Sequence, residues 1–155
     1  MRFVIQVCSK ADVRVDQKIV GKIGQGFLVL IGIGREDTIE IADAMVEKML
    51  KLRILPDENG KTNRSLADVN GSLLLISQFT LYADCHHGNR PNFLLAKAPD
   101  EAEAVYEHII EKCREKVPIV EHGIFGAEMQ VNLTNEGPFT IILDSRDIIK
   151  QPKSK

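Results

Sequence analysis

The sequence has few cysteines, no surplus of positive charge and no long hydrophobic run, and each shortage excludes a class of protein. Its cysteines, Cys8, Cys85 and Cys113, are odd in number and never form a Cys-x-x-Cys pair, which argues against a disulfide framework or a zinc knuckle. The formal net charge of −2 offers no overall basic field, so nucleic acid would have to be held locally. No apolar stretch approaches the roughly 20 residues that cross a bilayer, so we expect no membrane partner.

What is present indicates one globular domain. The chain has 155 residues, of which 44% are hydrophobic and 27% charged, enough for one sizeable core. We expect residues 1–145 to form this domain and residues 146–155 to be a polar C-terminal tail. The first residues enter an alternating apolar pattern rather than a basic, apolar leader, so we expect a cytoplasmic protein.

Apolar periodicity predicts strands early and late in the chain, with two helices between them. Strands are expected over residues 3–8, in a hairpin over 13–23, and centrally over 27–33. Asp37, with Glu40 three residues on, is typical of a helix start. The apolar residues that follow repeat at helical spacing through Leu50 and are expected to form the packed face: Ala42, Met45, Val46 and Met49. The second helix is predicted to begin at Pro99 and to stop before Pro118.

This order of elements predicts an α+β fold with a mainly antiparallel, β-barrel-like sheet and two main helices. The strands carry apolar residues on both faces, and two helices cannot cover both. The sheet should therefore curl into a barrel or pair with a second copy, and we expect a homodimer.

The most informative stretch is the apolar run 73–76, which leads directly into Ser77-Gln78-Phe79-Thr80-Leu81. Polar side chains at the end of a buried strand often line a pocket. Ser77, Gln78 and Thr80 either satisfy the strand end or bind a carbonyl oxygen and stabilise an oxyanion, as ester hydrolysis requires. A nucleophilic role for Thr80 is less well supported, because no general base is adjacent.

A second candidate segment runs from Asn135 to Thr140 and contains Gly137-Pro138. It is predicted to be a turn between the strand-like stretches 129–133 and 139–143. X-Pro bonds are usually trans, whereas a cis bond here would aim two successive carbonyls the same way. The sequence leaves both isomers open.

The histidines do not indicate a metal site. His86 and His87 are adjacent on a polar loop and cannot easily point at one ion, so we interpret them as solvated. No Gly-x-Ser-x-Gly elbow or His-Glu-x-x-His pattern occurs. We therefore expect no metal and no other cofactor, and chemistry that uses few side-chain acids and bases.

Several ordered motifs together resemble the D-aminoacyl-tRNA deacylases, and the likeness extends nearly to Ser145. The motifs are Ile5-Gln6, residues 24–32, Leu52-Arg53-Ile54, Ser77-Gln78-Phe79-Thr80-Leu81, Gly88-Asn89-Arg90-Pro91, Gly123-x-Phe125-Gly126-Ala127-x-Met129 and Asn135-x-Gly137-Pro138-x-Thr140.

The resemblance implies a dimer in which Gly137-Pro138 of one subunit enters the site of the other. The implied reaction hydrolyses the ester between a D-amino acid, or mischarged glycine, and the 3′ end of tRNA, releasing amino acid and tRNA. The implied site residues are Ser77, Gln78 and Thr80 for catalysis and Phe79, Met129, Gly137 and Pro138 for substrate binding.

The same resemblance implies a mechanism in which Gln78 and backbone N–H groups around Phe79 polarise the ester carbonyl. The terminal ribose 2′-hydroxyl would help to activate water, and Thr80 would position rather than attack. Two alternatives remain: a non-catalytic dimeric module that binds the aminoacylated tRNA end, and a small-ester hydrolase that uses Thr80.

This chain departs from the family pattern near its Gly-Pro segment. Val7 stands where the family commonly has an arginine that would brace the segment, and Phe139 stands where it usually has valine. Strictness against L-amino acids is therefore an open property of this chain. The sequence also does not rank the D-amino acids or name the tRNA.

Overall fold

The structure is a computed structural model that describes residues 1–149, so residues 150–155 of the predicted tail lie outside the described residues. The strands are β1 (Arg2–Val15), β2 (Lys18–Ile23), β3 (Gly26–Gly32), β4 (Leu55–Pro56), β5 (Thr62–Arg64), β6 (Ser72–Ser77), β7 (Val120–His122) and β8 (Gln130–Asp144). The helices are α1 (Ile39–Lys51), α2 (Pro99–Arg114) and α3 (Ser145–Ile148), with the 3-10 turns η1 (Ala67–Val69) and η2 (Phe79–Tyr82).

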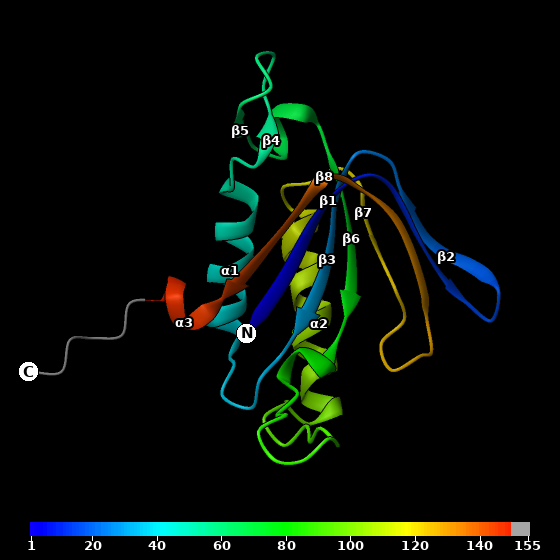
Figure 1. The fold of residues 1–155 in the computed structure, drawn as a ribbon, viewed down its shortest axis with the longest axis vertical. Helices are drawn as coiled ribbons and strands as arrows, with labels where there is room; N and C mark the ends of the chain where they lie inside the picture. Colours follow the sequence, from blue (N-terminus) through cyan, green and yellow to red (C-terminus); the bar gives the residue numbers. More distant parts are fainter. Residues whose placement is uncertain (150–155) are drawn as a thin grey trace, which may run out of the picture.

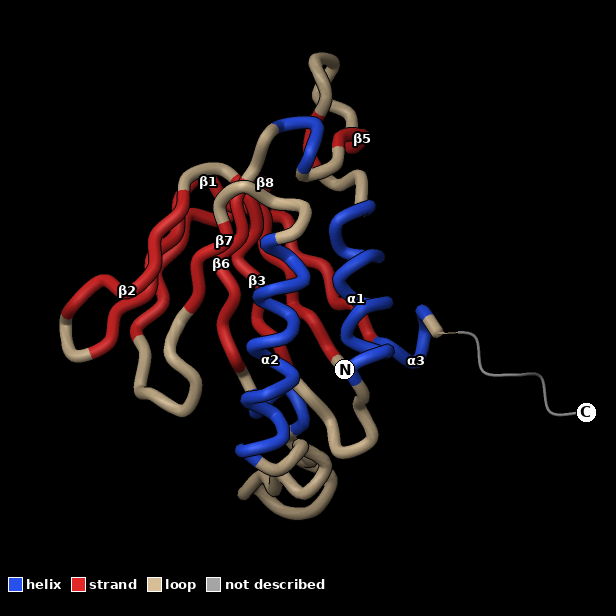
Figure 2. Tube along the Cα trace, turned by 180° about the vertical axis from the view of Figure 1, so that it is seen from behind, coloured by secondary structure: helices blue, strands red, loops and turns tan. Residues whose placement is uncertain are grey.

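A curled sheet with α1 and α2 on one face forms the body of the molecule (Figures 1 and 2). Its strand order is β2-β1-β3-β6-β7, and β8 pairs with β1. The antiparallel neighbours of β1 are β2, β3 and β8, while β3–β6 and β6–β7 are parallel. The prediction of an α+β fold with a mostly antiparallel, barrel-like sheet is confirmed. The parallel pairs arise because α1 and α2 lie in crossover connections, which parallel neighbours require.

Both faces of the sheet are buried. Along β6, Leu73 and Leu75 pack toward the helices, whereas Leu74 and Ile76 belong to a second cluster on the opposite face. That second cluster includes Ile23 of β2, and Val131 and Leu133 of β8 pack against it. This arrangement explains why the strand is apolar throughout.

Helix α1 buries the four residues predicted from its spacing: Ala42, Met45, Val46 and Met49. Its predicted start was wrong by one residue. The N-cap is Thr38, whose side chain accepts a hydrogen bond from the Ile41 N–H at 3.3 Å. Asp37 faces inward instead and is 7% exposed.

The predicted turn between two closing strands is also wrong. Residues 130–144 form one strand, β8, and both of its arms pair antiparallel with β1. Thr140 lies opposite Gln6 and Asn135 opposite Cys8, so the extra residues of β8 are accommodated by a register shift. The arms run in one direction and therefore cannot form a hairpin with each other.

A third, short helix follows β8, where the sequence predicted only the polar tail. The Asp144 side chain accepts a hydrogen bond from the Arg146 N–H at 3.0 Å and so caps α3. The Ser145 N–H donates to the Met1 carbonyl at 2.9 Å. The last residue of the predicted domain, immediately before the predicted tail, is thus attached to the first residue of the chain.

Candidate functional site

The polar motif lies where β6 ends and η2 begins. Ser77 is paired with Ile31 of β3, and the next residue, Gln78, donates its N–H to the Ile31 carbonyl at 2.7 Å. The chain then turns into η2, on which Phe79 and Thr80 are exposed. Because the strand is buried up to Ile76, the polar residues emerge at the edge of the core, as the sequence predicted.

Two of the three polar side chains of this motif, those of Gln78 and Thr80, contact each other. Gln78 donates a side-chain hydrogen bond from Nε2 to Thr80 Oγ1 at 2.5 Å. Within residues 1–149, the backbone N–H groups of Phe79 and Thr80 donate no hydrogen bond to another residue, as is common in the first turn of a helix. The motif therefore presents two backbone donors beside an amide and a hydroxyl, a set that can hold a carbonyl oxygen.

Phe79 projects beside this donor set. Its side chain is 58% exposed, and its ring packs edge-on against Phe93 of the following loop, with 5.0 Å between ring centroids. Within the loop over residues 83–98, a bridge joins Asp84 to Asn92, and a second bridge, from Gly34 to Ala96, returns the loop to the body of the protein. Through the Phe79–Phe93 contact, this loop lies beside the polar motif.

Met129 approaches the same strand end from the other side. It packs against the cluster that contains Ile76, the residue before Ser77. A Cβ on Gly123 would come within 2.5 Å of the Met129 sulfur and 3.4 Å of Ile76. The thioether thus occupies space that only a glycine at this position leaves open, which places Met129 close to β6.

Gly137-Pro138 lies in the irregular part of β8, and both residues are exposed. The peptide bond between them is cis, and Gly137 has a φ of 121°, in the region that favours glycine. Asn135 holds the segment: its Oδ1 accepts from the Phe139 N–H at 3.0 Å and its Nδ2 donates to Thr140 Oγ1 at 3.1 Å.

A single chain does not bring the two segments together. Strands β1 and β3 lie between β8 and β6, so spacings of about 4.8 Å place the two strands roughly 14 Å apart along the sheet. Within the described part of the chain, no hydrogen bond joins Gly137 or Pro138 to residues 77–80.

The two departures from the family pattern are explained by packing. Val7 is 5% exposed and belongs to the cluster between the sheet and the helices. Phe139 packs against the same cluster. Both apolar residues thus adjoin the main core, and the side chain of Asn135 provides the polar support of the Gly-Pro segment.

Two hollows and the exposed side chain of His86 lie outside the polar motif. A hollow of about 640 Å³ lies between the C-terminal ends of α1 and α2, and one of about 360 Å³ includes Met129; neither is lined by residues 77–80. His86 is 86% exposed, as expected for a solvated histidine, and binds the carboxylate of Asp84. Among residues 1–149 there is no cluster of three metal-ligating side chains. No helix in that range has the length and apolar character needed to cross a bilayer.

The sequence of this chain is similar to that of a known protein family along nearly its whole length. The sequence model of a family described as D-Tyr-tRNA(Tyr) deacylase matches residues 4–144. The D-aminoacyl-tRNA deacylase of Clostridium acetobutylicum is 49% identical to this protein, and the match covers 96% of this chain and 99% of the relative. That of Clostridium perfringens is 53% identical, and the match covers 94% of this chain and 98% of the relative. The D-aminoacyl-tRNA deacylase of Thermosipho africanus is 49% identical, and the match covers 96% of this chain and 99% of the relative.

Two solved structures share the fold. The c-Myc DNA Unwinding Element Binding Protein superposes with a TM-score of 0.88 at 39% identity, covering 93% of this chain and 98% of its own. A probable eukaryotic D-amino acid tRNA deacylase superposes with a TM-score of 0.80 at 20% identity, and the match covers 92% of this chain and 97% of the other chain. At this level of identity the likeness supports the fold alone. Because the family model and the bacterial relatives span nearly the whole chain, this protein belongs to the D-Tyr-tRNA(Tyr) deacylase family.

Proposed function

We propose that this protein is a D-aminoacyl-tRNA deacylase, which hydrolyses the ester between a D-amino acid and the 3′ end of tRNA. Water adds to the acyl carbon, the bond to the ribose oxygen breaks, and free amino acid and tRNA leave. The observation that carries the proposal is the full-length match to deacylases of 49% and 53% identity. Glycine attached to a non-cognate tRNA is expected to be a second substrate, because it has no side chain to exclude.

The donor set at residues 77–80 supports a mechanism without a covalent intermediate. The free N–H groups of Phe79 and Thr80 and the amide of Gln78 are suited to bind the ester carbonyl oxygen as negative charge develops on it. The ribose 2′-hydroxyl of the substrate would assist the attacking water. Thr80 is hydrogen-bonded to Gln78 and has no neighbouring base, so we assign it to positioning.

A second copy of the chain would complete the site. Gly137 and Pro138 are exposed in β8, which pairs on one edge with β1 and, within residues 1–149, with no other strand. Its Ile142 is 70% exposed. A long edge strand with an exposed apolar side chain is suited to cover by another chain. We assign that role to an identical subunit, whose Gly137-Pro138 would enter the site beside Ser77.

The partner of the assembled site is the aminoacylated 3′ end of tRNA. With a net charge of −2, the protein offers local contacts rather than a broad basic surface. Arg90 lies exposed on the loop that rims the site and is a candidate phosphate contact. Action in the cytoplasm, where tRNA is charged, is part of the proposal.

The test is hydrolysis of matched D-tyrosyl-, L-tyrosyl- and glycyl-tRNA by catalytic amounts of purified protein, with a chelator present. We expect release from the D-aminoacyl and glycyl substrates and not from the L-aminoacyl substrate. Binding of the charged tRNA end without turnover would favour the non-catalytic module. Covalent labelling of Thr80, with indifference to the 2′-hydroxyl, would favour the small-ester hydrolase.

A further inference from the structure

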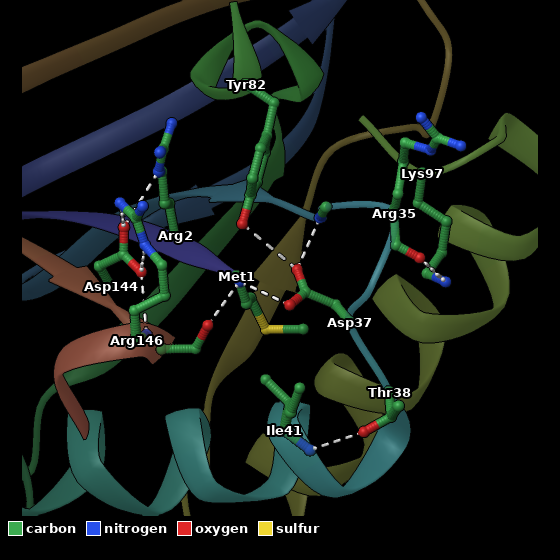
Figure 3. Close-up of polar contacts among 12 residues, drawn as sticks. Met1, Arg2, Arg35, Asp37, Thr38, Ile41, Tyr82, Lys97, Asp144 and Arg146 are labelled. Carbon is green, nitrogen blue, oxygen red and sulfur yellow. Dashed lines mark hydrogen bonds and ion pairs between the residues drawn. The ribbon is translucent and has the colours of Figure 1, made fainter. Parts of the chain in front are cut away.

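The α-ammonium group of Met1 is buried and makes two hydrogen bonds. It donates to Asp37 Oδ1 at 2.7 Å and to Ser145 Oγ at 2.7 Å (Figure 3). Met1 is 2% exposed, Asp37 7% and Ser145 6%. Burial lowers the pKa of this amine, and the hydrogen bond and charge of Asp37 oppose the shift.

The carboxylate of Asp37 links this ammonium to the candidate site. Its second oxygen accepts from the Gly34 N–H at 2.6 Å and from the Tyr82 hydroxyl at 3.4 Å. Tyr82 is the last residue of η2, the turn that carries Phe79 and Thr80. Burial and the charge of Asp37 raise the pKa of Tyr82, which keeps its hydroxyl protonated as a donor.

Arg2 fixes the same turn from the neighbouring position. Its Nη1 donates to the Leu81 carbonyl at 2.7 Å. Its guanidinium lies 4.6 Å from the centre of the Tyr82 ring, and both side chains are drawn in Figure 3. Its Nε donates to Asp144 at 3.1 Å. Arg2 therefore contacts the last two residues of η2 directly, whereas Met1 is linked to Tyr82 through Asp37.

The fit of η2 against β3 leaves little room for displacement. A Cβ on Gly34 would approach the Tyr82 ring to 2.8 Å, and one on Gly32 would approach the Leu81 Cβ to 2.8 Å. Such contacts transmit small movements, because packed side chains have no free volume to absorb them. A shift of Tyr82 would move the backbone donors of η2.

We infer that the Met1 ammonium, acting through Asp37 and together with Arg2, is a positioning device that sets η2 for catalysis. These groups do not touch the substrate; they hold Phe79 and Thr80 through Leu81 and Tyr82. Adding residues ahead of Met1, or masking its amine, would displace the ammonium and misplace the donors. The inference rests on the proposed function.

The experiment compares protein that begins with a free Met1, verified by intact mass, with protein that carries Gly-Ser ahead of Met1. The chain contains two tyrosines, Tyr82 and Tyr106, so fluorotyrosine labelling gives two fluorine resonances. Tyr106 donates its hydroxyl to the Leu75 carbonyl in the core and serves as an internal control for folding. Tyr82→Phe assigns the signals.

We expect the extension to move the Tyr82 resonance and leave that of Tyr106 in place. Misplacing a catalytic group by about 1 Å can cost on the order of 100-fold in rate, so kcat for D-tyrosyl-tRNA should fall roughly 10- to 100-fold. KM should change by less than about threefold, since orientation rather than substrate contact is lost.

A milder variant keeps the inference testable if the extension unfolds the protein. Arg2→Met retains bulk but removes the donor to Leu81, and it should shift Tyr82 and lower kcat. The matched control is Arg53→Met. Arg53, like Arg2, donates to a backbone carbonyl, in this case from Nε to that of Asn63 at 2.9 Å, in a part of the chain separate from η2.

A shifted Tyr82 resonance with unchanged kcat in a folded variant would overturn the inference, as would no change in either quantity. An equal fall in kcat for Arg53→Met would also overturn it. If the unmodified protein hydrolyses no aminoacyl-tRNA, the proposed function fails instead. The Tyr82 resonance alone then decides whether Met1 anchors η2.

Discussion

Replacing Asn135 with alanine should loosen the Gly-Pro segment while sparing the rest of the fold. Its side chain makes two hydrogen bonds across the segment, from the Phe139 N–H at 3.0 Å and to Thr140 Oγ1 at 3.1 Å. The residue is half-buried, and Gly137 and Pro138 are exposed. Alanine removes both bonds without creating a large cavity.

The magnitude follows from the number of bonds. Each contributes about 0.5–1.5 kcal/mol, so the ordered conformation of the segment loses about 1–3 kcal/mol relative to alternatives. This corresponds to roughly a five- to hundredfold change in population. If the segment excludes L side chains, as proposed, discrimination between D- and L-aminoacyl-tRNA should fall by a similar factor.

The assay measures kcat/KM for D-tyrosyl- and L-tyrosyl-tRNA and compares their ratio in Asn135→Ala and in the unmodified protein. The matched control is Asn132→Ala on the same strand. Asn132 donates to Asp12 Oδ1 at 3.2 Å and lies outside the Gly-Pro segment. Thermal unfolding of both variants shows whether either change reaches the whole fold.

An unchanged D-to-L ratio in a folded Asn135→Ala protein would refute the assignment of this segment to selectivity. An equal loss of ratio in Asn132→Ala would refute the local explanation. A fall in rate for both substrates at constant ratio would mean that the segment supports catalysis and does not discriminate.

Three further predictions concern other parts of the molecule. Thr80→Ala should retain substantial deacylation, because Thr80 positions Gln78; complete loss in a folded dimer would restore the nucleophile hypothesis. A thiol reagent should label only Cys85 in native protein, since burial raises the pKa of Cys8 to about 11 and of Cys113 to about 12; mass spectrometry reads the sites, and fast labelling of a second cysteine would contradict the fold. Hydrogen-bonded arginines lower the pKa of Asp144, so its contribution to stability is present above the usual aspartate pKa of about 4 and is lost as pH falls below it. Asp144→Asn should therefore lower the free energy of unfolding at pH 7 and make that free energy depend less on pH in the acid range. Denaturant unfolding at pH 7 and at an acid pH below the usual aspartate pKa tests this.

Elements with a strong local pattern were predictable from sequence. The spacing of Ala42, Met45, Val46 and Met49 identified the buried face of α1, and the apolar run beginning at residue 27 identified the central strand β3. The polar end of β6 was found for the same reason, because a buried strand that turns suddenly polar must reach an edge of the core.

Elements whose form depends on distant partners were not predictable. The segment around Gly137-Pro138 has the composition of a turn, yet β1 pairs with both of its flanks and makes β8 one strand. Asp37 has the chemistry of a helix cap, yet it is recruited by Met1, 36 residues away, and Thr38 takes the cap.

The sequence by itself determined the class of fold, the buried faces of its strands and helices, and the family, because periodicity and ordered motifs are local properties of the chain. Only the tertiary structure decided that β8 runs unbroken beside β1, that Arg2 reaches η2 about 80 residues later, and that Met1 is linked to the same turn through Asp37. The physical reason is that a carboxylate or carbonyl binds whichever donor the folded chain brings to it, and residues far apart in sequence carry no local signature of that meeting.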